Sequence, residues 1–475
     1  MTLKTTLYEH QQTAVNKLLP IRIGALYMEM GTGKSCATLE MITRRYNAGR
    51  ITKAIWLCPC SVKATIAREI VKHIEGDLSA IEVHGIESLS SSIKLFEYLF
   101  AMVKSHKVML VVDESILVKN HKAKRTQNIK RLAEYCPYRL ILNGTPVSRT
   151  EADLFAQWQI LDWRVLGYKS FWSFAANHIE WDEKYRGRIR HCLNIDYLTD
   201  KIAPYTYQVR KEDCLTLPPK VERTGYFNLT SEQARHYNDV VEFYLPPSED
   251  ESERWRSSAP IYRLFTACQQ AASGRRLNLE SYDKPITSEP FFPDMLDNPR
   301  MESLMNTVSR IEGKVLIWCK YTHEIEDVSK VLADEYGANS VTRLYGKMDI
   351  KARNRSLDLF ENTARFLVGN KSCGGYGLNL QFCSDVVYYN NDFNWSGRAQ
   401  SEDRVHRIGQ DKTVVITSLC GVSTIDEMVL ANLARKTQLV ESFMSEIDGV
   451  KDKRTYLKDM LKGVVDRGCK EKTVS

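Results

Sequence analysis

The sequence contains no run of about twenty apolar residues, the length that a helix needs to cross a bilayer. Its first residues, Met1–Lys4, lack the apolar core of a secretory signal. Short internal repeats and extended low-complexity segments are also absent. These absences predict an intracellular protein that has no membrane partner.

Cysteine patterns typical of zinc sites are missing as well. The twelve cysteines are scattered, and several lie within apolar runs, as free thiols do in a reducing compartment. The closest pair is Cys58 and Cys60, and no CxxC pair or Cys/His cluster has the spacing of zinc ligands. We therefore expect free thiols and no structural zinc.

The chain has no large excess of charge of one sign. Its net charge is +7 and its pI is about 8.6, values that are compatible with a polyanionic partner without establishing one. A length of 475 residues fits two or three domains. Each half of the chain is long enough to bury its own core.

A phosphate-binding loop is predicted at Met28–Ser35, directly after the apolar run Ile23–Tyr27. Backbone amides of Gly31–Lys34 would surround phosphates, Lys34 would reach the β and γ oxygens, and Ser35 would ligate Mg²⁺. Met28 stands where the strict pattern has its first glycine, so a chance strand-to-helix turn is the alternative. The residues predicted to contact the nucleotide here are Met30, Gly31, Thr32, Gly33, Lys34 and Ser35.

An acidic pair ends a second apolar run, Val108–Val112. Buried carboxylates are costly without a cation or hydrogen-bond donors, and a metal ion would remove this cost. Asp113 would hold Mg²⁺ directly or through water, and Glu114 would orient and deprotonate an attacking water. The alternative is a strand that simply ends in a turn at Asp113.

The segment Gln400–Gln410 places Arg404 and Arg407 about one helical turn apart. A guanidinium keeps its charge near neutral pH and presents a fixed fork of donors, which suits the charge on a transferring γ-phosphoryl group. The pair therefore resembles an arginine finger, with Gln400 as a further catalytic candidate. A solvated basic helix face is the alternative.

Taken in order, these segments resemble the Swi/Snf family of DNA-translocating ATPases within helicase superfamily two. The resemblance covers most of the chain, and the HRIGQ ending of Gln400–Gln410 is a hallmark of the family. The matching motifs are Leu7–Gln11 (adenine-reading), Met28–Ser35 (phosphate loop), Pro59–Val62 (Ia), Asp113–Asn120 (II), Leu142–Pro146 (III), Lys314–Cys319 (IV), Lys371–Leu380 (V) and Gln400–Gln410 (VI).

The resemblance implies an ATP site in a cleft between two lobes. Gln11 would read the adenine, Gly377 would also contact ATP, and the arginines of motif VI would complete the site when the lobes close. ATP with Mg²⁺ is the only cofactor expected. The resemblance also implies contacts to DNA phosphates rather than to bases. The residues expected to touch DNA are Ser61, Lys119, Asn120, Lys371, Ser372, Phe393 and Trp395.

Three departures from the family pattern lie outside the phosphate chemistry. Ile116 stands where the family usually has histidine in motif II, which puts in doubt any coupling through that imidazole. Ile66 replaces the usual tryptophan of motif Ia, and Phe393-Asn394-Trp395 replaces Trp-Asn-Pro. An aromatic residue in this loop would stack on a base or sugar, whereas packing under motif VI is the alternative for both aromatics.

The fold class expected is α/β, with two RecA-like lobes, each a mainly parallel sheet covered by helices, and with helical protrusions between them. Apolar strands alternate with helical stretches in both halves, as in parallel sheets. The strands expected are Ile23–Tyr27, Ala54–Cys58, Val108–Val112, Arg139–Leu142, Val315–Cys319, Val341–Tyr345, Phe366–Gly369, Val386–Tyr389 and Val414–Leu419. The divisions expected are an ATP-binding lobe (1–150), a helical protrusion and linker (151–225), a second protrusion (226–310), a helicase lobe (311–435) and a helical tail (436–475).

The function expected is an ATP-hydrolysing motor that moves on double-stranded or branched DNA without sequence preference and remodels DNA structures or protein–DNA complexes. We expect a monomeric, compact stand-alone type, located in the cytoplasm or nucleoid of a bacterium or in a host cell. Two alternatives are a strand-separating helicase and a DNA-binding scaffold whose ATPase has decayed. Asn143-Gly144-Thr145-Pro146 differs from the Ser-Ala-Thr of the commonest RNA helicases, and the phosphate-site residues are intact.

Overall fold

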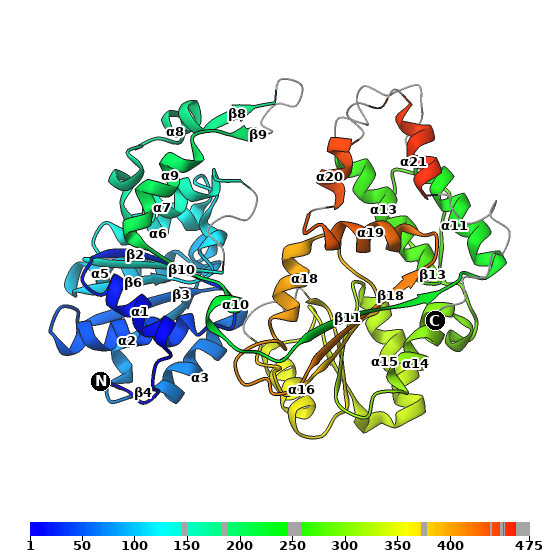
Figure 1. Ribbon diagram of the computed structural model, residues 1–475, viewed down its shortest axis with the longest axis horizontal. Coiled ribbons are helices and arrows are strands. Elements are labelled where there is room, and N and C mark those ends of the chain that lie inside the picture. The colour runs from blue at the N-terminus through cyan, green and yellow to red at the C-terminus, as the bar shows by residue number, and fades with distance from the viewer. Residues whose placement is uncertain are drawn as a thin grey trace. The chain divides into compact units, whose positions relative to one another are not determined.

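The computed structural model describes residues 1–144, 150–182, 189–245, 258–371, 378–437, 439–446, 450 and 452–461. The chain divides into two compact units, one formed mainly by Met1–Leu217 and the other mainly by Pro218–Gly375 and Asn379–Ser475 (Figure 1). Each unit contains one six-stranded sheet.

The sheet of the first unit is parallel throughout. Its central strands are almost entirely buried, because helices cover both faces of a parallel sheet. The strand order is β10 (Thr206–Val209), β2 (Ile23–Met28), β7 (Tyr138–Asn143), β6 (Val108–Val112), β3 (Lys53–Cys58) and β5 (Ile81–Gly85).

Side chains alternate along each strand between two cores. One core packs against α1 (Glu9–Leu18), α2 (Lys34–Asn47) and α3 (Lys63–His73). The other core packs against the next helices along the chain and against a small helical extension. These elements are α4 (Ser88–Ser91), α5 (Ile93–Ser105), α6 (Lys124–Ala133), α7 (Asp153–Leu166), α8 (Phe171–His178), the antiparallel pair β8 (Ile179–Trp181) and β9 (Ile189–Cys192), and α9 (Ile195–Ile202). The remaining elements are the antiparallel pair β1 (Thr2–Leu3) and β4 (Ile74–Glu75), and α10 (Lys211–Cys214).

The second unit repeats the parallel six-stranded design. Helices α14 (Pro299–Val308) and α15 (Thr322–Tyr336) bury one face. On the other face, the Tyr388 hydroxyl is hydrogen-bonded to Ser401 of α18 (Trp395–Glu402) at 2.5 Å. The strand order is β11 (Lys220–Phe227), β18 (Val414–Gly421), β17 (Asp385–Tyr388), β14 (Val315–Trp318), β16 (Phe366–Gly369) and β15 (Val341–Leu344), with α16 (Ile350–Asn362) contacting β15.

A helical region with its own apolar core completes the second unit (Figure 1). It contains α11 (Ser231–Tyr244), α13 (Ser258–Ala272), α19 (Ile425–Ala434), α20 (Leu439–Glu446), α21 (Lys453–Leu461) and the short antiparallel pair β12 (Arg275–Leu277) and β13 (Ser288–Pro290). Segments far apart in the sequence meet in this core, since α13 packs against both α19 and α20.

The predicted fold class is confirmed, because two parallel sheets covered by helices make the two RecA-like lobes. The strands that were predicted are all present. The sequence patterns missed β5, β10 and β11 at edges of the six-stranded sheets, and they also missed the three short antiparallel pairs. The observed boundary between the units falls at Leu217 and Pro218, and the finer divisions into five parts stay a prediction. Within the described ranges, no helix combines the length and apolar character that crossing a bilayer requires.

Candidate active site

The phosphate loop joins β2 to the N-terminus of α2. Gly31 and Gly33 both have positive φ angles, 82° and 84°, which side chains other than glycine rarely adopt. A Cβ atom at Gly33 would also lie 2.1 Å from Nε2 of Gln11. Backbone amides at the start of a helix attract anions, so the loop has the geometry to surround phosphates.

Gln11, the predicted adenine-reading residue, lies against this loop. Its Nε2 donates to the Thr32 carbonyl at 3.0 Å, and its Oε1 accepts from the Tyr8 amide at 3.1 Å. His10 approaches the same carbonyl through Nε2 at 2.8 Å, a contact that the sequence motif did not predict. Helix α1 and the phosphate loop are therefore held together, and adenine recognition by Gln11 stays a prediction.

Lys34 begins α2 and carries the loop's only side-chain cation. Its Nζ donates to the Met28 carbonyl at 2.7 Å, and its charge also acts on Asp113. Ser35 follows in the first turn of the helix and is half-buried. The loop thus brings the cation of Lys34 close enough to act on the acidic pair that follows β6.

Asp113 is buried and lies at the end of β6. Burial and then the charge of Glu114 raise the pKa of the Asp113 carboxyl to about 7, while Lys34 opposes the rise. Oδ1 accepts the Glu114 amide at 2.9 Å, and Oδ2 accepts the Trp56 indole N–H at 3.4 Å. A buried carboxylate with so few donors beside a second carboxylate is a site that favours a cation.

These donors fit a magnesium ion that arrives with a nucleotide. Ser35 and Asp113 offer the oxygen ligands that Mg²⁺ prefers, and phosphates and water usually supply the others. Among the described residues, no group of three or more His, Cys, Asp or Glu side chains could hold a metal ion. With a bound nucleotide, Ser35 and Asp113 would therefore supply part of the coordination of the ion.

Glu114 has a left-handed backbone, with φ 49° and ψ 53°. For a residue other than glycine this conformation costs on the order of 1–3 kcal/mol and persists where surrounding contacts hold it. It opens a 3₁₀ turn, Ser115–Val118, in which the Leu117 amide donates to the Glu114 carbonyl at 2.9 Å. The strained position is that of the predicted general base.

The predicted arginines lie in the second unit, after α18. Arg404 is largely buried, and its carbonyl accepts the Leu380 amide at 3.0 Å. Arg407 is half-buried, and its guanidinium donates to the side chain of Asn379, within motif V. Gln400 is half-buried on α18. Motifs V and VI are therefore joined within this unit, while their approach to the phosphate loop stays a prediction.

Ion pairs fix the orientation of α18. Arg398 pairs with Glu402 one turn later at 2.5 Å, and Lys220 of β11 pairs with the same carboxylate at 2.8 Å. Arg398 and Glu402 are buried, whereas 32% of the Lys220 side chain is exposed.

The predicted DNA contacts of the first unit differ in their surroundings. Ser61 and Asn120 are exposed. Lys119 forms an ion pair with Asp153 of α7 at 3.6 Å between Nζ and Oδ2, and about a third of the side chain remains exposed. All three follow strands β3 and β6 at the carboxyl edge of the sheet. Contact with DNA stays a prediction for each of them.

Two lysines, the buried Lys371 and the half-buried Lys320, lie at the carboxyl edge of the second sheet. Lys371 was predicted to contact DNA, and its burial lowers its pKa to about 8. Lys320 was not predicted from the sequence, although it follows β14 by two residues, just as Lys371 follows β16. Burial also lowers the pKa of Lys320 to about 8. Lys320 Nζ donates to Gln269 Oε1 at 2.8 Å and lies 3.9 Å from Asp392 Oδ1. Ser372 and Gly377 fall outside the described residues.

Phe393 lies in the apolar core of the helical region and is only 4% exposed. Its ring makes edge contacts with Tyr262 and Phe265, and Lys320 Nζ lies 3.4 Å from its centroid. Trp395 is half-buried against the same core. Phe393 therefore packs in a core, the alternative to DNA contact that its sequence position left open. Stacking on a base would require the ring to leave this core.

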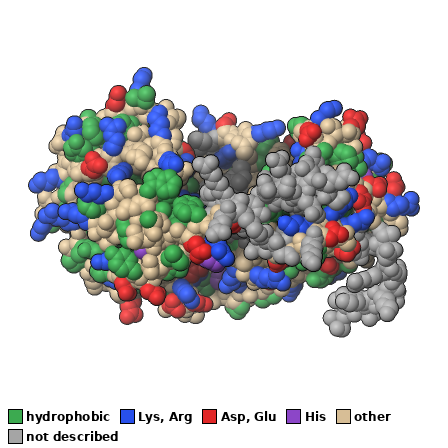
Figure 2. Space-filling model, turned by 90° about the horizontal axis from the view of Figure 1, so that it is seen from above, with side chains coloured by type: hydrophobic (Ala, Val, Ile, Leu, Met, Phe, Trp, Pro, Cys, Tyr) green, Lys and Arg blue, Asp and Glu red, His purple; other side chains and the backbone are tan. Residues whose placement is uncertain are grey.

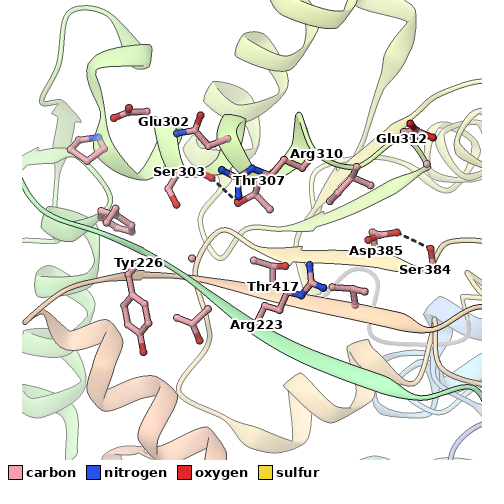
Figure 3. Close-up of a pocket in the computed structure, with 18 of the residues that line it drawn as sticks. Arg223, Tyr226, Glu302, Ser303, Thr307, Arg310, Glu312, Ser384, Asp385 and Thr417 are labelled. Atoms are coloured by element: carbon pink, nitrogen blue, oxygen red, sulfur yellow. Dashed lines mark hydrogen bonds between the residues drawn. The ribbon is translucent and has the colours of Figure 1, made fainter. Parts of the chain in front are cut away.

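The second unit also has a polar groove of about 1110 Å³ beside the edge strand β11 (Figure 3). Arg223 of β11 and Thr417 of β18 line one side, and Ser303 and Thr307 of α14 line the other. Gly225 leaves room between them, since a Cβ there would lie 3.0 Å from Leu419 Cδ2. None of the residues that line the groove was among the site residues predicted from the sequence.

On the face seen in Figure 2, charge does not mark a single basic area, since the described Lys and Arg side chains are interspersed with Asp and Glu. The cations that follow strand ends, such as Lys119 and Lys371, remain the candidate anion contacts.

Two family models match the chain. A model described as the SNF2-related domain matches residues 10–272, and one described as the helicase conserved C-terminal domain matches residues 299–409. Together they include the phosphate loop, the acidic pair and the arginines of motif VI.

Relatives with curated descriptions are similar at low identity. Protein CHROMATIN REMODELING 4 of Arabidopsis thaliana is 22% identical over 456 residues, covering 90% of this chain and 20% of that protein. The putative ATP-dependent helicase/translocase YwqA of Bacillus subtilis is 24% identical over 465 residues, covering 92% of this chain and 48% of that protein. The chain thus spans less than half the length of either. The solved SWI2/SNF2 ATPase core of Sulfolobus solfataricus in complex with dsDNA is 21% identical, with a TM-score of 0.39 and 97% of both chains covered.

Proposed function

Because the chain belongs to the SNF2-related family, whose model matches residues 10–272, we propose that it is a DNA-dependent ATPase that translocates on double-stranded DNA. On this proposal it binds ATP with Mg²⁺, moves without sequence preference, and remodels branched DNA or protein–DNA complexes. It acts as a monomer.

The observation that carries the proposal is the convergence of Lys34, Asp113 and Glu114 at one edge of the first sheet. The charges of Lys34 and Glu114 both act on the Asp113 carboxyl. Lys34 would bind the β and γ oxygens, and Ser35 with Asp113 would hold Mg²⁺, which would neutralise phosphate charge. Glu114 would accept a proton from the water that attacks the γ-phosphorus.

The second unit would supply the cations that hydrolysis still needs. Arg407, with Arg404 and Gln400, would approach the γ-phosphate when the two units close on ATP. The guanidinium of Arg407 is positioned by Asn379 of motif V, so a change in motif V would also alter this arginine. Closure and opening would then move one unit along the duplex.

The test measures ATP turnover by the full chain with no nucleic acid, with duplex DNA, with single-stranded DNA and with single-stranded RNA. Duplex DNA should stimulate turnover most, and Lys34→Ala serves as the control without phosphate binding. Binding to duplex DNA should weaken with salt at a slope near −0.9 per phosphate contact. Maximal stimulation by RNA, or binding that ignores salt, would contradict the proposal.

A second assay distinguishes translocation from strand separation. A motor on duplex DNA should displace a triplex-forming strand ahead of it while leaving the duplex strands paired. Separation of a labelled duplex would instead support the strand-separating helicase. A wild-type chain that binds duplex DNA without turning over ATP would support the scaffold with a decayed ATPase.

A further inference from the structure

A buried hydrogen bond connects the catalytic turn, defined as residues Glu114–Lys119, to α7. The Ser115 hydroxyl, directly after Glu114, donates to Gln157 Oε1 at 2.6 Å, and both residues are fully buried. Gln157 Nε2 in turn donates to the Asp153 carbonyl at 3.0 Å. A buried amide with both ends satisfied holds its partners more firmly than one exchanging with water.

A second contact joins the far end of the same turn to the same helix. Lys119 Nζ lies 3.6 Å from Asp153 Oδ2, and Asp153 is the first residue of α7. Ser115 and Lys119 are four residues apart in the turn, and Asp153 and Gln157 are four residues apart on the helix. Both ends of the turn are thus attached to successive turns of α7.

This double attachment surrounds a strained residue. Glu114 has its positive φ of 49° one position before Ser115, and such a conformation needs neighbours that hold it. Ile116, in the position where the related motif usually has histidine, has an apolar side chain and cannot supply a polar contact. The Ser115–Gln157 bond is a buried polar contact that holds the turn on the side of α7, while Arg125 and Thr126 of α6 donate to the Leu117 and Val118 carbonyls of the same turn.

We infer that Gln157 is a positioning residue, which holds Glu114 in its hydrolytic position through Ser115 and couples that position to DNA through Asp153 and Lys119. The inference rests on the proposed function, since it explains how duplex DNA stimulates hydrolysis. A DNA phosphate that approaches Lys119 competes with Asp153 for the ammonium. The change in this ion pair reaches the catalytic turn through α7.

The test substitutes Gln157→Leu, which keeps the approximate volume, and Ser115→Ala, singly and together. Turnover is measured with and without duplex DNA, and the KM for ATP and the free energy of unfolding are determined for each variant. Gln159→Leu is the matched control, because Gln159 lies on α7 but bonds Lys130 and Tyr168 instead of the turn.

Each single variant should reduce the stimulation by DNA by roughly tenfold, within the usual range of coupling between two sites, while the KM for ATP changes little. The double variant should recover much of the lost stability, since removing both partners leaves no unpaired buried group. It should not recover the stimulation. Gln159→Leu should keep the stimulation of the wild type.

Recovery of the stimulation together with stability in the double variant would show a merely structural role and overturn the inference. Equal stimulation in Gln157→Leu and wild type would overturn it as well, while leaving the proposed function intact. A wild-type chain that ignores duplex DNA would overturn the proposed function and this inference together.

A further variant, Asp153→Asn, leaves both partners of the buried Ser115–Gln157 bond in place. It keeps the backbone carbonyl that Gln157 uses and removes the charge that pairs with Lys119. Affinity for duplex DNA should rise, because the substitution removes a carboxylate that competes with DNA phosphates for the ammonium, while the stimulation of turnover falls. Parallel losses of affinity and stimulation would contradict the coupling route.

Discussion

The strand ends that carry site residues differ in charge between the two parallel sheets. In the first unit, Asp113 and Glu114 follow β6 directly, and the charge of Lys34 acts on Asp113. In the second unit, β14 and β16 are each followed two residues later by a lysine, the half-buried Lys320 and the buried Lys371. The same architecture therefore places carboxylates after a strand of one sheet and ammonium groups after two strands of the other.

Burial acts on both edges in the same physical direction, towards the neutral form of each group. It raises the pKa of Asp113 to about 7 and lowers the pKa of Lys320 and Lys371 to about 8. A ligand of opposite charge would relieve each penalty: a metal ion at the first edge and a phosphate at the second. The fold supplies the positions, and the residue types at the strand ends decide which ligand each position favours.

The strongest test of this comparison is Arg407→Ala. If the second unit supplies a transition-state cation to the phosphate site, turnover should fall by roughly 10³-fold or more, with a much smaller loss of ATP affinity. Steady-state kinetics and nucleotide binding measure the two effects. Arg355→Ala, an exposed arginine on α16, is the control. Turnover near the wild-type rate would mean that the second unit serves only DNA.

Glu114→Gln tests the acidic edge. Turnover should fall by about 10²–10⁴-fold, because the amide cannot accept a proton, while ATP binding is retained. Lys34→Ala should instead weaken ATP binding itself. Equilibrium binding of a labelled nucleotide to both variants separates the two roles. Equal loss of binding in the two would refute the assignment of Glu114 as the base.

Phe393→Ala tests whether the second edge is a packed core or a DNA wedge. Truncating a buried phenylalanine should lower the free energy of unfolding by about 3–5 kcal/mol, as measured by urea unfolding. Trp172→Ala, at a side chain that is 66% exposed, is the control. A stable variant that hydrolyses ATP on DNA but no longer displaces a triplex-forming strand would support the wedge instead.

Lys371→Met gives the smallest expected effect, a change in the free energy of unfolding that depends on pH. The pKa of Lys371 is about 8 in the folded chain and about 10.4 when unfolded, so the unfolded chain binds more protons between these values. The free energy of unfolding of the wild type should therefore rise with pH in this window, by at most about 1.4 kcal/mol per unit.

Below pH 8 the penalty for the buried charge is fully present, and Lys371→Met should be the more stable protein. Its advantage should shrink as the pH rises to 10. Urea unfolding at several pH values measures the difference, with the exposed Lys347→Met as the control. An advantage that does not change with pH would mean that folding does not lower the pKa of Lys371.

The sequence predicted the central strands because burial on both faces leaves continuous apolar runs, such as Val108–Val112. It missed the edge strand Lys220–Phe227, in which most residues are exposed and the apolar run is absent. The short strand β10 (Thr206–Val209) lies at an edge of the first sheet, and its residues are mostly half-buried. It was missed because it also lacks a continuous apolar run. Continuous apolar character identifies the fully buried strands, whereas β10 and β11 lack it and become strands through pairing with β2 and β18.

The phosphate loop and the acidic pair could be predicted because their chemistry requires particular residues at fixed spacing. Contacts between distant segments could not. The bond from Ser115 to Gln157 spans 42 positions, and nothing in either neighbourhood marks it. The burial of Phe393 likewise depends on Tyr262 and Phe265, more than a hundred residues earlier.

The hydrogen bond between Trp56 and Asp113 gives the catalytic turn a natural optical probe. The indole is fully buried, and its N–H lies 3.4 Å from the carboxylate, so a change in charge at Asp113 alters the electric field across the ring. The chain has eight tryptophans, and the difference between the emission of the wild type and of Trp56→Phe isolates this one. Fluorescence can therefore follow events at the acidic edge in real time without an attached label.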